Sequence, residues 1–334
     1  MNNTLDFIIE DGVLTGYVGT AEQIVIPSGV EIIGAAAFGG SHGIRSVAIP
    51  DTVTRICDGA FSSCMNLEHV TLPPSLRSIG NGAFSGCFSI REILLPEGLE
   101  SIGDDAFNPC YDVLRVSIPA TLTHIGRSAF QGCNNAESLC VSEGNTVYHA
   151  DCGCLIETAS RTLIFGTKNA VIPADGSVRA IGYGAFCECD AIKKIVIPDC
   201  VTKIGEYAFC GCEALGHITL PATLTEIPTG MLLQCSALCE IDIPGALTRI
   251  GKSAFENCVA LRAVALPEGL AIIEDDTFKC CAALERVLLP ASLTYIGERA
   301  FCACHKLTMP QLPDGVHVAK GAFSGCIGEE GYPV

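Results

Sequence analysis

The sequence predicts a solenoid, an elongated single domain made of stacked copies of one 23-residue unit. Prolines recur with this spacing in two series: Pro27, Pro50, Pro73, Pro96, Pro119 and then Pro198, Pro221, Pro244, Pro267, Pro290, Pro313. A second pattern, I-G-x-x-A-F-x-x-C, returns in the same register, for example at Ile79–Cys87 and Ile102–Cys110. Because so short a unit cannot bury its apolar face alone, repetition at a fixed period indicates that neighbouring units stack into one core.

Each unit has two halves. The half before the proline, as in Leu67–Pro73 (LEHVTLP), has apolar residues at its first, fourth and sixth places. This pattern predicts a short parallel strand with one buried and one open face, closed by a proline that donates no hydrogen bond. The half after the proline, as in Pro74–Cys87 (PSLRSIGNGAFSGC), places apolar residues among glycines. It is expected to return the chain to the next strand through tight turns.

The apolar position of the A-F motif predicts the centre of the core. Phenylalanine fills it in eleven units and Leu232 in one; the phenylalanines are Phe38, Phe61, Phe84, Phe107, Phe130, Phe186, Phe209, Phe255, Phe278, Phe301 and Phe323. A residue kept in one register by every unit should meet its counterpart from the next unit, so these rings are expected to form a row.

Cysteines follow the same register. Eleven of the 21 lie three residues after the A-F position: Cys64, Cys87, Cys110, Cys133, Cys189, Cys212, Cys235, Cys258, Cys281, Cys304 and Cys326. Parallel Cβ directions and an odd number argue against disulfides, and a small, weakly polar side chain suits a buried row, so reduced structural thiols are predicted. Among the other cysteines, Cys187 and Cys210 share one position in adjacent units and are candidates for reversible pairing. The zinc signal is weak, because only Cys302–His305 (CACH) adds a nearby histidine.

These motifs resemble those of the BspA-like leucine-rich repeat proteins, whose usual unit is similar to Ile49–Pro73 (IPDTVTRICDGAFSSCMNLEHVTLP). The resemblance implies a leucine-rich repeat solenoid, a right-handed curved superhelix with a parallel β-sheet on the concave face and turns or short helical segments on the convex face. It also implies secretion or a cell-surface location and a role in adhesion, without catalytic residues in the repeat and without a cofactor. The chain as given starts without a secretory signal, so either it stays inside the cell or its start has been trimmed.

The expected organisation is a single leucine-rich repeat domain over residues 1–334. Residues 1–26 would form a hairpin cap and the first strand, residues 27–141 and 173–326 regular repeats, and residues 327–334 a C-terminal tail. Residues 142–172 resemble the irregular, hairpin-bearing units that such proteins insert between regular repeats. The last strand, Leu307–Pro313, carries Pro310 at a core place, and a proline there would blunt the sheet edge. A monomer is therefore expected.

Composition and motifs narrow the function. The chain holds 20 basic and 37 acidic residues and no tryptophan, which disfavours nucleic acid as a partner. Its apolar stretches are far shorter than the roughly 20 residues that cross a bilayer, so no membrane insertion is expected. The usual motifs for nucleophilic catalysis, metalloprotease chemistry and phosphate binding are absent, and no enzyme or metal site is predicted.

The remaining candidate is the open face of the strands, whose charges are nearly balanced and whose fifth places form a small and partly apolar row. Such a surface favours a protein or peptide ligand. The residues expected to contact it are Arg91, Leu94, Arg115, Lys168, Lys193, Lys194, Val196 and His217. The sequence leaves two alternatives open: a structural spacer or stalk of a larger surface protein, and a thiol-based redox or metal-binding protein.

Overall fold

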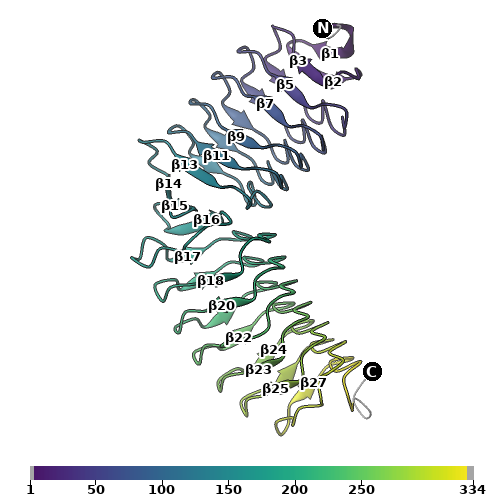
Figure 1. Cartoon of the computed structure of the whole chain (residues 1–334), viewed down its shortest axis with the longest axis vertical. Helices are drawn as coiled ribbons and strands as arrows, with labels where there is room; N and C mark the ends of the chain where they lie inside the picture. The colour runs from purple at the N-terminus through teal and green to yellow at the C-terminus, as the bar shows by residue number, and fades with distance from the viewer. Residues whose placement is uncertain (1–3, 329–334) are drawn as a thin grey trace. The chain divides into compact units, whose positions relative to one another are not determined.

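A computed structural model describes residues 4–328 of the chain. The fold consists of coils of about 23 residues, and each coil contributes short parallel strands that stack on those of the next coil (Figure 1). The repeats of about 23 residues are called coils from here on, and the coils form two larger compact units, the first unit and the second unit. The first comprises the chain through Ala159 together with Phe165–Lys168, and the second comprises Ser160–Ile164 and the chain from Asn169 onward. The boundary falls within residues 142–172, the segment expected to be irregular.

The first unit begins with a 3-10 turn, η1 (Thr4–Asp6), and contains two kinds of sheet. Strands before the prolines form one kind, called here the pre-proline sheet: β3 (Gln23–Val25), β5 (Ser46–Ala48), β7 (His69–Thr71), and then β9 (Glu92–Leu94), β11 (Arg115–Ile118), β13 (Ser138–Val141). Two-residue strands after the prolines form the post-proline sheet: β4 (Ile32–Ile33), β6 (Arg55–Ile56), β8 (Ser78–Ile79), β10 (Ser101–Ile102) and β12 (His124–Ile125).

The second unit repeats this arrangement. Its pre-proline strands are β18 (Lys194–Val196) paired with β20 (His217–Thr219), and β23 (Ala263–Ala265) paired with β25 (Arg286–Leu288). The start of β16 (Thr162–Gly166) pairs with β17 (Ala180–Ile181) and this in turn with β19 (Lys203–Ile204). The post-proline sheet then resumes with β21 (Glu226–Ile227), β22 (Arg249–Ile250), β24 (Ile272–Ile273), β26 (Tyr295–Ile296) and β27 (His317–Val318). Partners such as Lys194 and His217 are 23 residues apart, so the sheet register confirms the predicted period.

The post-proline sheet was not expected from the sequence. The segment after each proline was predicted to consist of turns or short helical segments, but its x-Ile pair forms a two-residue parallel strand in most coils. The A-F segment that follows does form turns, and it uses the left-handed backbone region two residues before and two residues after the phenylalanine, as at Gly82 and Gly86. Glycine adopts these dihedral angles without steric cost, which accounts for its frequency in the motif.

The predicted phenylalanine row is present in both units. In the first unit the rings of Phe38, Phe61, Phe84, Phe107 and Phe130 stack in order, with centroids 4.7 to 5.7 Å apart and interplanar angles of at most 6°. In the second unit Phe186 stacks on Phe209, and Phe255, Phe278, Phe301 and Phe323 stack in series with separations of 5.0 to 5.2 Å. All these rings are buried, so the row is the centre of the core.

The predicted cysteine row is buried as well, and the structure explains its register. The thiol of Cys64 donates a hydrogen bond to the carbonyl oxygen of Phe38 in the preceding coil at 3.1 Å, and Cys281 does the same to Phe255 at 3.1 Å. Burial raises the pKa of Cys258 to about 12, so this thiol stays protonated and can donate. A cysteine three residues after the phenylalanine therefore supplies a second hydrogen bond to an interior carbonyl group that would otherwise be under-satisfied.

Hairpins occur at both predicted places. β1 (Phe7–Glu10) pairs antiparallel with β2 (Val13–Tyr17), and β14 (Tyr148–Asp151) with β15 (Cys154–Glu157). The first hairpin extends the post-proline sheet, because β2 pairs with β4. At the other end of the chain, the Pro310 segment forms only an isolated parallel bridge between Thr308 and Ile327.

Within the second unit, one coil interrupts the post-proline sheet. In regular coils the residue after the strand isoleucine donates its N–H to the isoleucine of the preceding coil, as Gly205 does to Ile181 and Gly251 to Ile227, both at 2.8 Å. Pro228 occupies this position and has no N–H to donate. Within residues 4–328 the sheet accordingly ends at β19 and resumes at β21. The turns of the two coils remain bonded, because Phe209 donates to Met231 at 3.0 Å.

Pro228→Gly is expected to restore the missing hydrogen bond to Ile204. The gain of about 0.5–1.5 kcal/mol from a buried hydrogen bond is partly offset by the greater entropy of the unfolded chain, so stability should change by less than about 1 kcal/mol. The decisive measurement is hydrogen exchange: the new amide at position 228 should be protected as well as those of Gly205 and Gly251. Pro198→Gly is the control, since it adds the same chain entropy away from the interruption. Rapid exchange at position 228 would show that the proline does not cause the gap.

Candidate interaction surface

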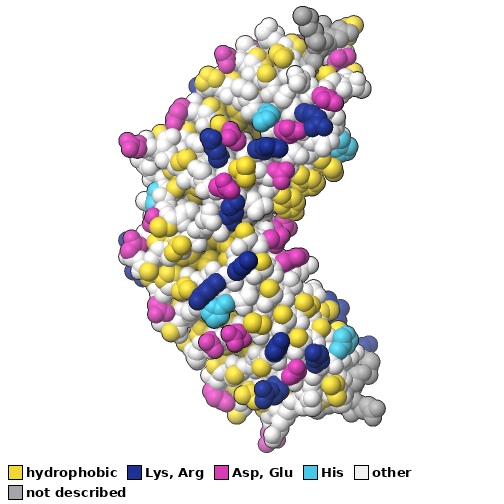
Figure 2. Space-filling model, viewed as in Figure 1, with side chains coloured by type: hydrophobic (Ala, Val, Ile, Leu, Met, Phe, Trp, Pro, Cys, Tyr) yellow, Lys and Arg dark blue, Asp and Glu magenta, His cyan; other side chains and the backbone are white. Residues whose placement is uncertain are grey.

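The outward-facing side chains of the pre-proline strands come from alternating positions. In β18 the buried Ile195 separates Lys194 from Val196, and both of these side chains are exposed. The same alternation leaves Leu94 exposed in β9 and places Arg91 at the surface just before that strand. A parallel strand with one buried face presents every second side chain outward, so the repeat generates rows of exposed residues. Viewed as in Figure 2, basic, acidic and hydrophobic side chains are interspersed over the surface.

Several charges in these rows compensate one another from strand to strand. Arg45 lies between Glu22 and Glu68, with N–O distances of 3.6 and 2.7 Å. Arg115 contacts Glu92 at 3.2 Å, and Lys168 contacts Glu137 at 2.9 Å. In each pair at least one side chain is more than half exposed, so the pair contributes little stability, about 0–1 kcal/mol. Two residues predicted to contact a ligand, Arg115 and Lys168, therefore have their charge balanced by a neighbouring carboxylate.

Other predicted residues lie together in the second unit. β18 and β20 pair so that Lys194 is opposite His217 and Val196 is opposite Thr219. His217 is half-buried, whereas Lys193 and Lys194 are exposed. None of the ion pairs between residues of the described part of the chain includes Lys193 or Lys194. Lys168, which was also expected to contact a ligand, belongs to the first unit, where its ammonium group contacts Glu137.

An open apolar groove lies over the same strand. It has a volume of about 590 Å³ and is lined by Ala170, Val171, Ile172, Ala174, Lys194, Ile195, Val196 and Pro198. Val171 and Val196 are 66% and 51% exposed, which is high for aliphatic side chains. The groove therefore combines adjacent exposed valines with one lysine at its rim. We refer to these lining residues as the Val171–Val196 groove.

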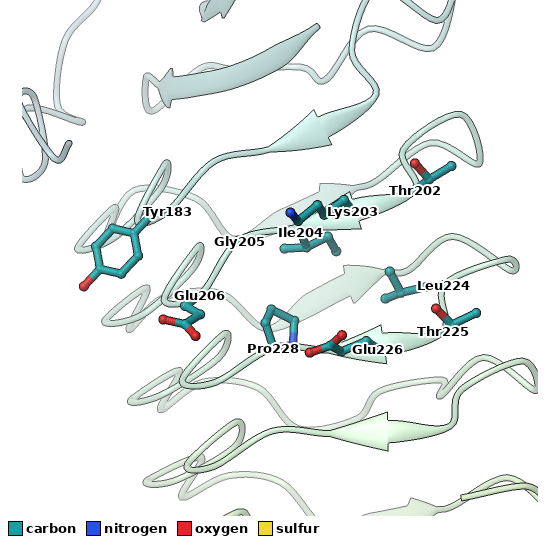
Figure 3. Close-up of a pocket in the computed structure, with 10 residues that line it drawn as sticks. All are labelled: Tyr183, Thr202, Lys203, Ile204, Gly205, Glu206, Leu224, Thr225, Glu226 and Pro228. Atoms are coloured by element: carbon teal, nitrogen blue, oxygen red, sulfur yellow. The ribbon is translucent and has the colours of Figure 1, made fainter. Parts of the chain in front are cut away.

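A second hollow lies at the interruption between β19 and β21. Its volume is about 410 Å³, and Figure 3 shows Lys203 and Ile204 from β19, Glu226 from β21, and Pro228 just beyond. The carboxylate of Glu226 is already in contact with the guanidinium of Arg249. This hollow was not predicted from the sequence, although the replacement of the motif's glycine by proline at position 228 could have indicated it.

The described residues offer no assembly of metal ligands, since no group of three or more His, Cys, Asp and Glu side chains in residues 4–328 could hold an ion. A search of the same residues for a helix of sufficient length and hydropathy to span a bilayer finds none. The features available for recognition are therefore the strand surface, its groove and the half-buried side chains of the turns.

Repeated coils with parallel strands and rows of interior phenylalanine and cysteine define a leucine-rich repeat scaffold. The family of the BspA type leucine rich repeat region matches residues 9–137, 166–282 and 234–330, and the chain belongs to this family. Both the predicted family and the predicted fold are thereby confirmed. No curated protein matches the chain.

Solved structures agree on the fold. A leucine-rich repeat protein from Eubacterium ventriosum is 23% identical, with a TM-score of 0.71, and the match covers 94% of this chain and 88% of that one. A leucine rich cell surface protein from Faecalibacterium prausnitzii is 26% identical, with a TM-score of 0.55 and coverage of 91% and 92%. The pneumococcal vaccine antigen PcpA is 22% identical, with a TM-score of 0.67 and coverage of 89% and 73%.

Proposed function

We propose that this protein is a non-catalytic scaffold that binds another protein through the exposed face of its pre-proline strands. The observation that carries the proposal is the Val171–Val196 groove, where aliphatic side chains remain exposed beside Lys194. Exposed apolar surface bordered by charge is characteristic of sites that bind proteins or peptides. Repeat proteins use such extended strand surfaces for binding because every coil adds another row of contacts.

The chemistry of the groove indicates the kind of ligand. Val171 and Val196 would contact aliphatic or aromatic side chains, and the ammonium groups of Lys193 and Lys194 would attract carboxylates. We therefore expect an extended segment in which apolar and acidic residues alternate. The similarity to a leucine rich cell surface protein of Faecalibacterium prausnitzii supports a place at the cell surface, and adhesion is the role proposed for the scaffold there.

Lys194→Glu and Val196→Glu are expected to weaken binding at least about tenfold each, because one reverses the attracting charge and the other places a carboxylate in the apolar groove. The ligand for this measurement comes from selecting a random peptide library on the intact chain, and affinity is then measured by calorimetry. Lys203→Glu makes the same charge change on the post-proline sheet, and Val25→Glu makes the same apolar-to-acidic change in the first unit; both controls should stay within about twofold.

A spacer or stalk predicts a different outcome. If no peptide is enriched on the intact chain, or if enriched peptides bind all four variants equally, the groove is not a recognition site. Enrichment of acidic and apolar peptides that lose affinity only with the two groove variants would support the scaffold.

A further inference from the structure

The position directly after the A-F phenylalanine forms a half-buried row in which side chains of adjacent coils meet. Lys279 contacts Glu256 of the preceding coil at 2.8 Å, and the Ser85 hydroxyl donates to the backbone carbonyl oxygen of Asn108 in the next coil. Cys187 and Cys210 occupy two successive positions of this row in the second unit. The row therefore places these two thiols side by side in adjacent coils, whereas Cys302, in the same row, has Lys279 and Ser324 at the neighbouring positions.

The coils are in close register around the two cysteines. The rings of Phe186 and Phe209, the preceding residues, are parallel within 5° and have centroids 5.0 Å apart. Phe186 donates its N–H to Ala208 at 2.8 Å, and Glu188 donates to the carbonyl oxygen of Cys210 at 2.7 Å. The Cα atoms joined by disulfides are usually about 4.4–6.8 Å apart, a range that includes the spacing of these coils.

The two thiols are in hydrogen-bonding contact but differ in environment. Cys187 is 4% exposed, whereas Cys210 is only half-buried. The hydrogen bond to Cys210 and burial raise the pKa of Cys187, and the same hydrogen bond lowers the pKa of Cys210. Cys210 is thus the more accessible thiol and the one that more readily forms a thiolate.

The cysteines of the buried row differ from Cys210 in accessibility, and Cys212 among them also differs in pKa. Cys212, two residues beyond Cys210, is fully buried and donates its hydrogen bond to the carbonyl oxygen of Phe186 at 3.1 Å. Its burial raises its pKa well above the usual range. Buried, protonated thiols of this kind react slowly, so the cysteine row is expected to remain reduced when the more accessible Cys210 reacts.

We propose that Cys187 and Cys210 form a redox site that exchanges with low-molecular-weight disulfides and closes reversibly into a disulfide between adjacent coils. The Cys210 thiolate attacks one sulfur of the small disulfide, and a small thiolate leaves. Cys187 then loses its proton to that thiolate and attacks the Cys210 sulfur of the mixed disulfide, whose S–S bond breaks to release the second small thiolate; this takes up the proton that Cys210 had given to solvent. Two cysteine thiols are oxidised to one disulfide, and the small disulfide is reduced to two thiols.

The test uses the folded full-length chain in buffers of graded oxidised-to-reduced glutathione ratio. After acid quenching and alkylation under denaturing conditions, mass spectrometry maps which cysteines are linked. The Cys187–Cys210 link should be the principal cross-link and should disappear on return to reduced glutathione, while Cys212 and the other cysteines of the buried row should be recovered as alkylated, unlinked thiols.

Two variants separate the roles of the thiols. Cys187→Ser should trap glutathione on Cys210, because no second thiol resolves the mixed disulfide. Cys210→Ser should leave Cys187 at least about tenfold less modified, because its thiol is buried. As a geometric control, Ser62→Cys with Ser85→Cys places two thiols at successive positions of the same row in the first unit, and this pair should also cross-link.

The proposal is overturned if the wild-type chain forms other cross-links but not Cys187–Cys210, or if Cys210 remains unmodified in Cys187→Ser. It is also overturned if the engineered pair closes while the native pair does not, since the row would then permit a disulfide that Cys187 is too buried to form. Mapping the cross-links of the wild-type chain tests the proposed Cys187–Cys210 disulfide even where a variant folds poorly.

Discussion

Phe84→Ala is expected to lower the free energy of unfolding by roughly 3–5 kcal/mol, the usual cost of removing a buried phenylalanine ring. The ring of Phe84 is 1% exposed. It lies between Phe61, with centroids 5.1 Å apart, and Phe107, at 5.3 Å. Truncation to alanine would remove both ring contacts and leave a cavity that the fixed spacing of the coils prevents from collapsing.

Urea denaturation followed by circular dichroism measures this loss, and native-state hydrogen exchange locates it. Because each coil contacts mainly its neighbours, protection should fall most in the coils containing Phe61, Phe84 and Phe107 and least around Phe301. Arg91→Ala is the control: its side chain is exposed, so the change should be less than about 0.5 kcal/mol. A loss below about 1 kcal/mol for Phe84→Ala would mean that the phenylalanine row contributes little to stability.

The sequence predicted the rows because they depend only on period. Any residue type that returns every 23 positions must meet its counterpart in the next coil, so the positions of Phe84 and Cys87 in the core followed directly from counting. The post-proline sheet was not predicted from the sequence, and the reason is physical. A strand of two residues, such as β8, is too short for an alternating pattern, and only the backbone hydrogen bonds between coils reveal it.

The candidate surface was harder to predict because the net charge that it presents to a ligand depends on which charged side chains pair with one another. Arg115 and Glu92 are 23 residues apart at the same place of adjacent strands, so their ion pair was readable in principle. Lys168 and Glu137 are 31 residues apart, because the irregular segment with its hairpin lies between them, and the period alone gave no indication of that contact. Similarly, Pro228 was visible in the sequence, but its effect required knowledge of the hydrogen bond that glycine donates at this position.

In one coil Met231 and Leu232 replace the alanine and phenylalanine of the A-F motif. Substituting them should have the second large effect on stability. They occupy the alanine and phenylalanine positions of one coil, and both are fully buried. The coil keeps the usual register, since Phe209 donates to Met231 at 3.0 Å and Leu232 to Ala254 at 2.9 Å. A larger side chain at the first position and a smaller one at the second therefore fill the space that alanine and phenylalanine fill elsewhere.

Met231→Ala alone is expected to cost roughly 2–5 kcal/mol, because it removes a buried side chain and Leu232 is too short to fill the cavity. Leu232→Phe alone should cost roughly 1–3 kcal/mol, because the ring would be forced into space that Met231 occupies. Urea denaturation of each variant gives these values, with Met309→Ala as a control, since Met309 lies outside the buried core.

The double variant Met231→Ala/Leu232→Phe restores the A-F motif and should be more stable than Met231→Ala alone, with a coupling free energy of at least about 1 kcal/mol between the two sites. Its ring would join Phe209 to Phe255, which at present are separated by Leu232, and would make the phenylalanine row continuous from Phe186 to Phe323. The volume removed at position 231 is the volume needed at position 232, so the two costs should largely cancel. If the two losses simply add in the double variant, the two positions do not share one packing space, and the Met-Leu pair is not a compensated form of the motif.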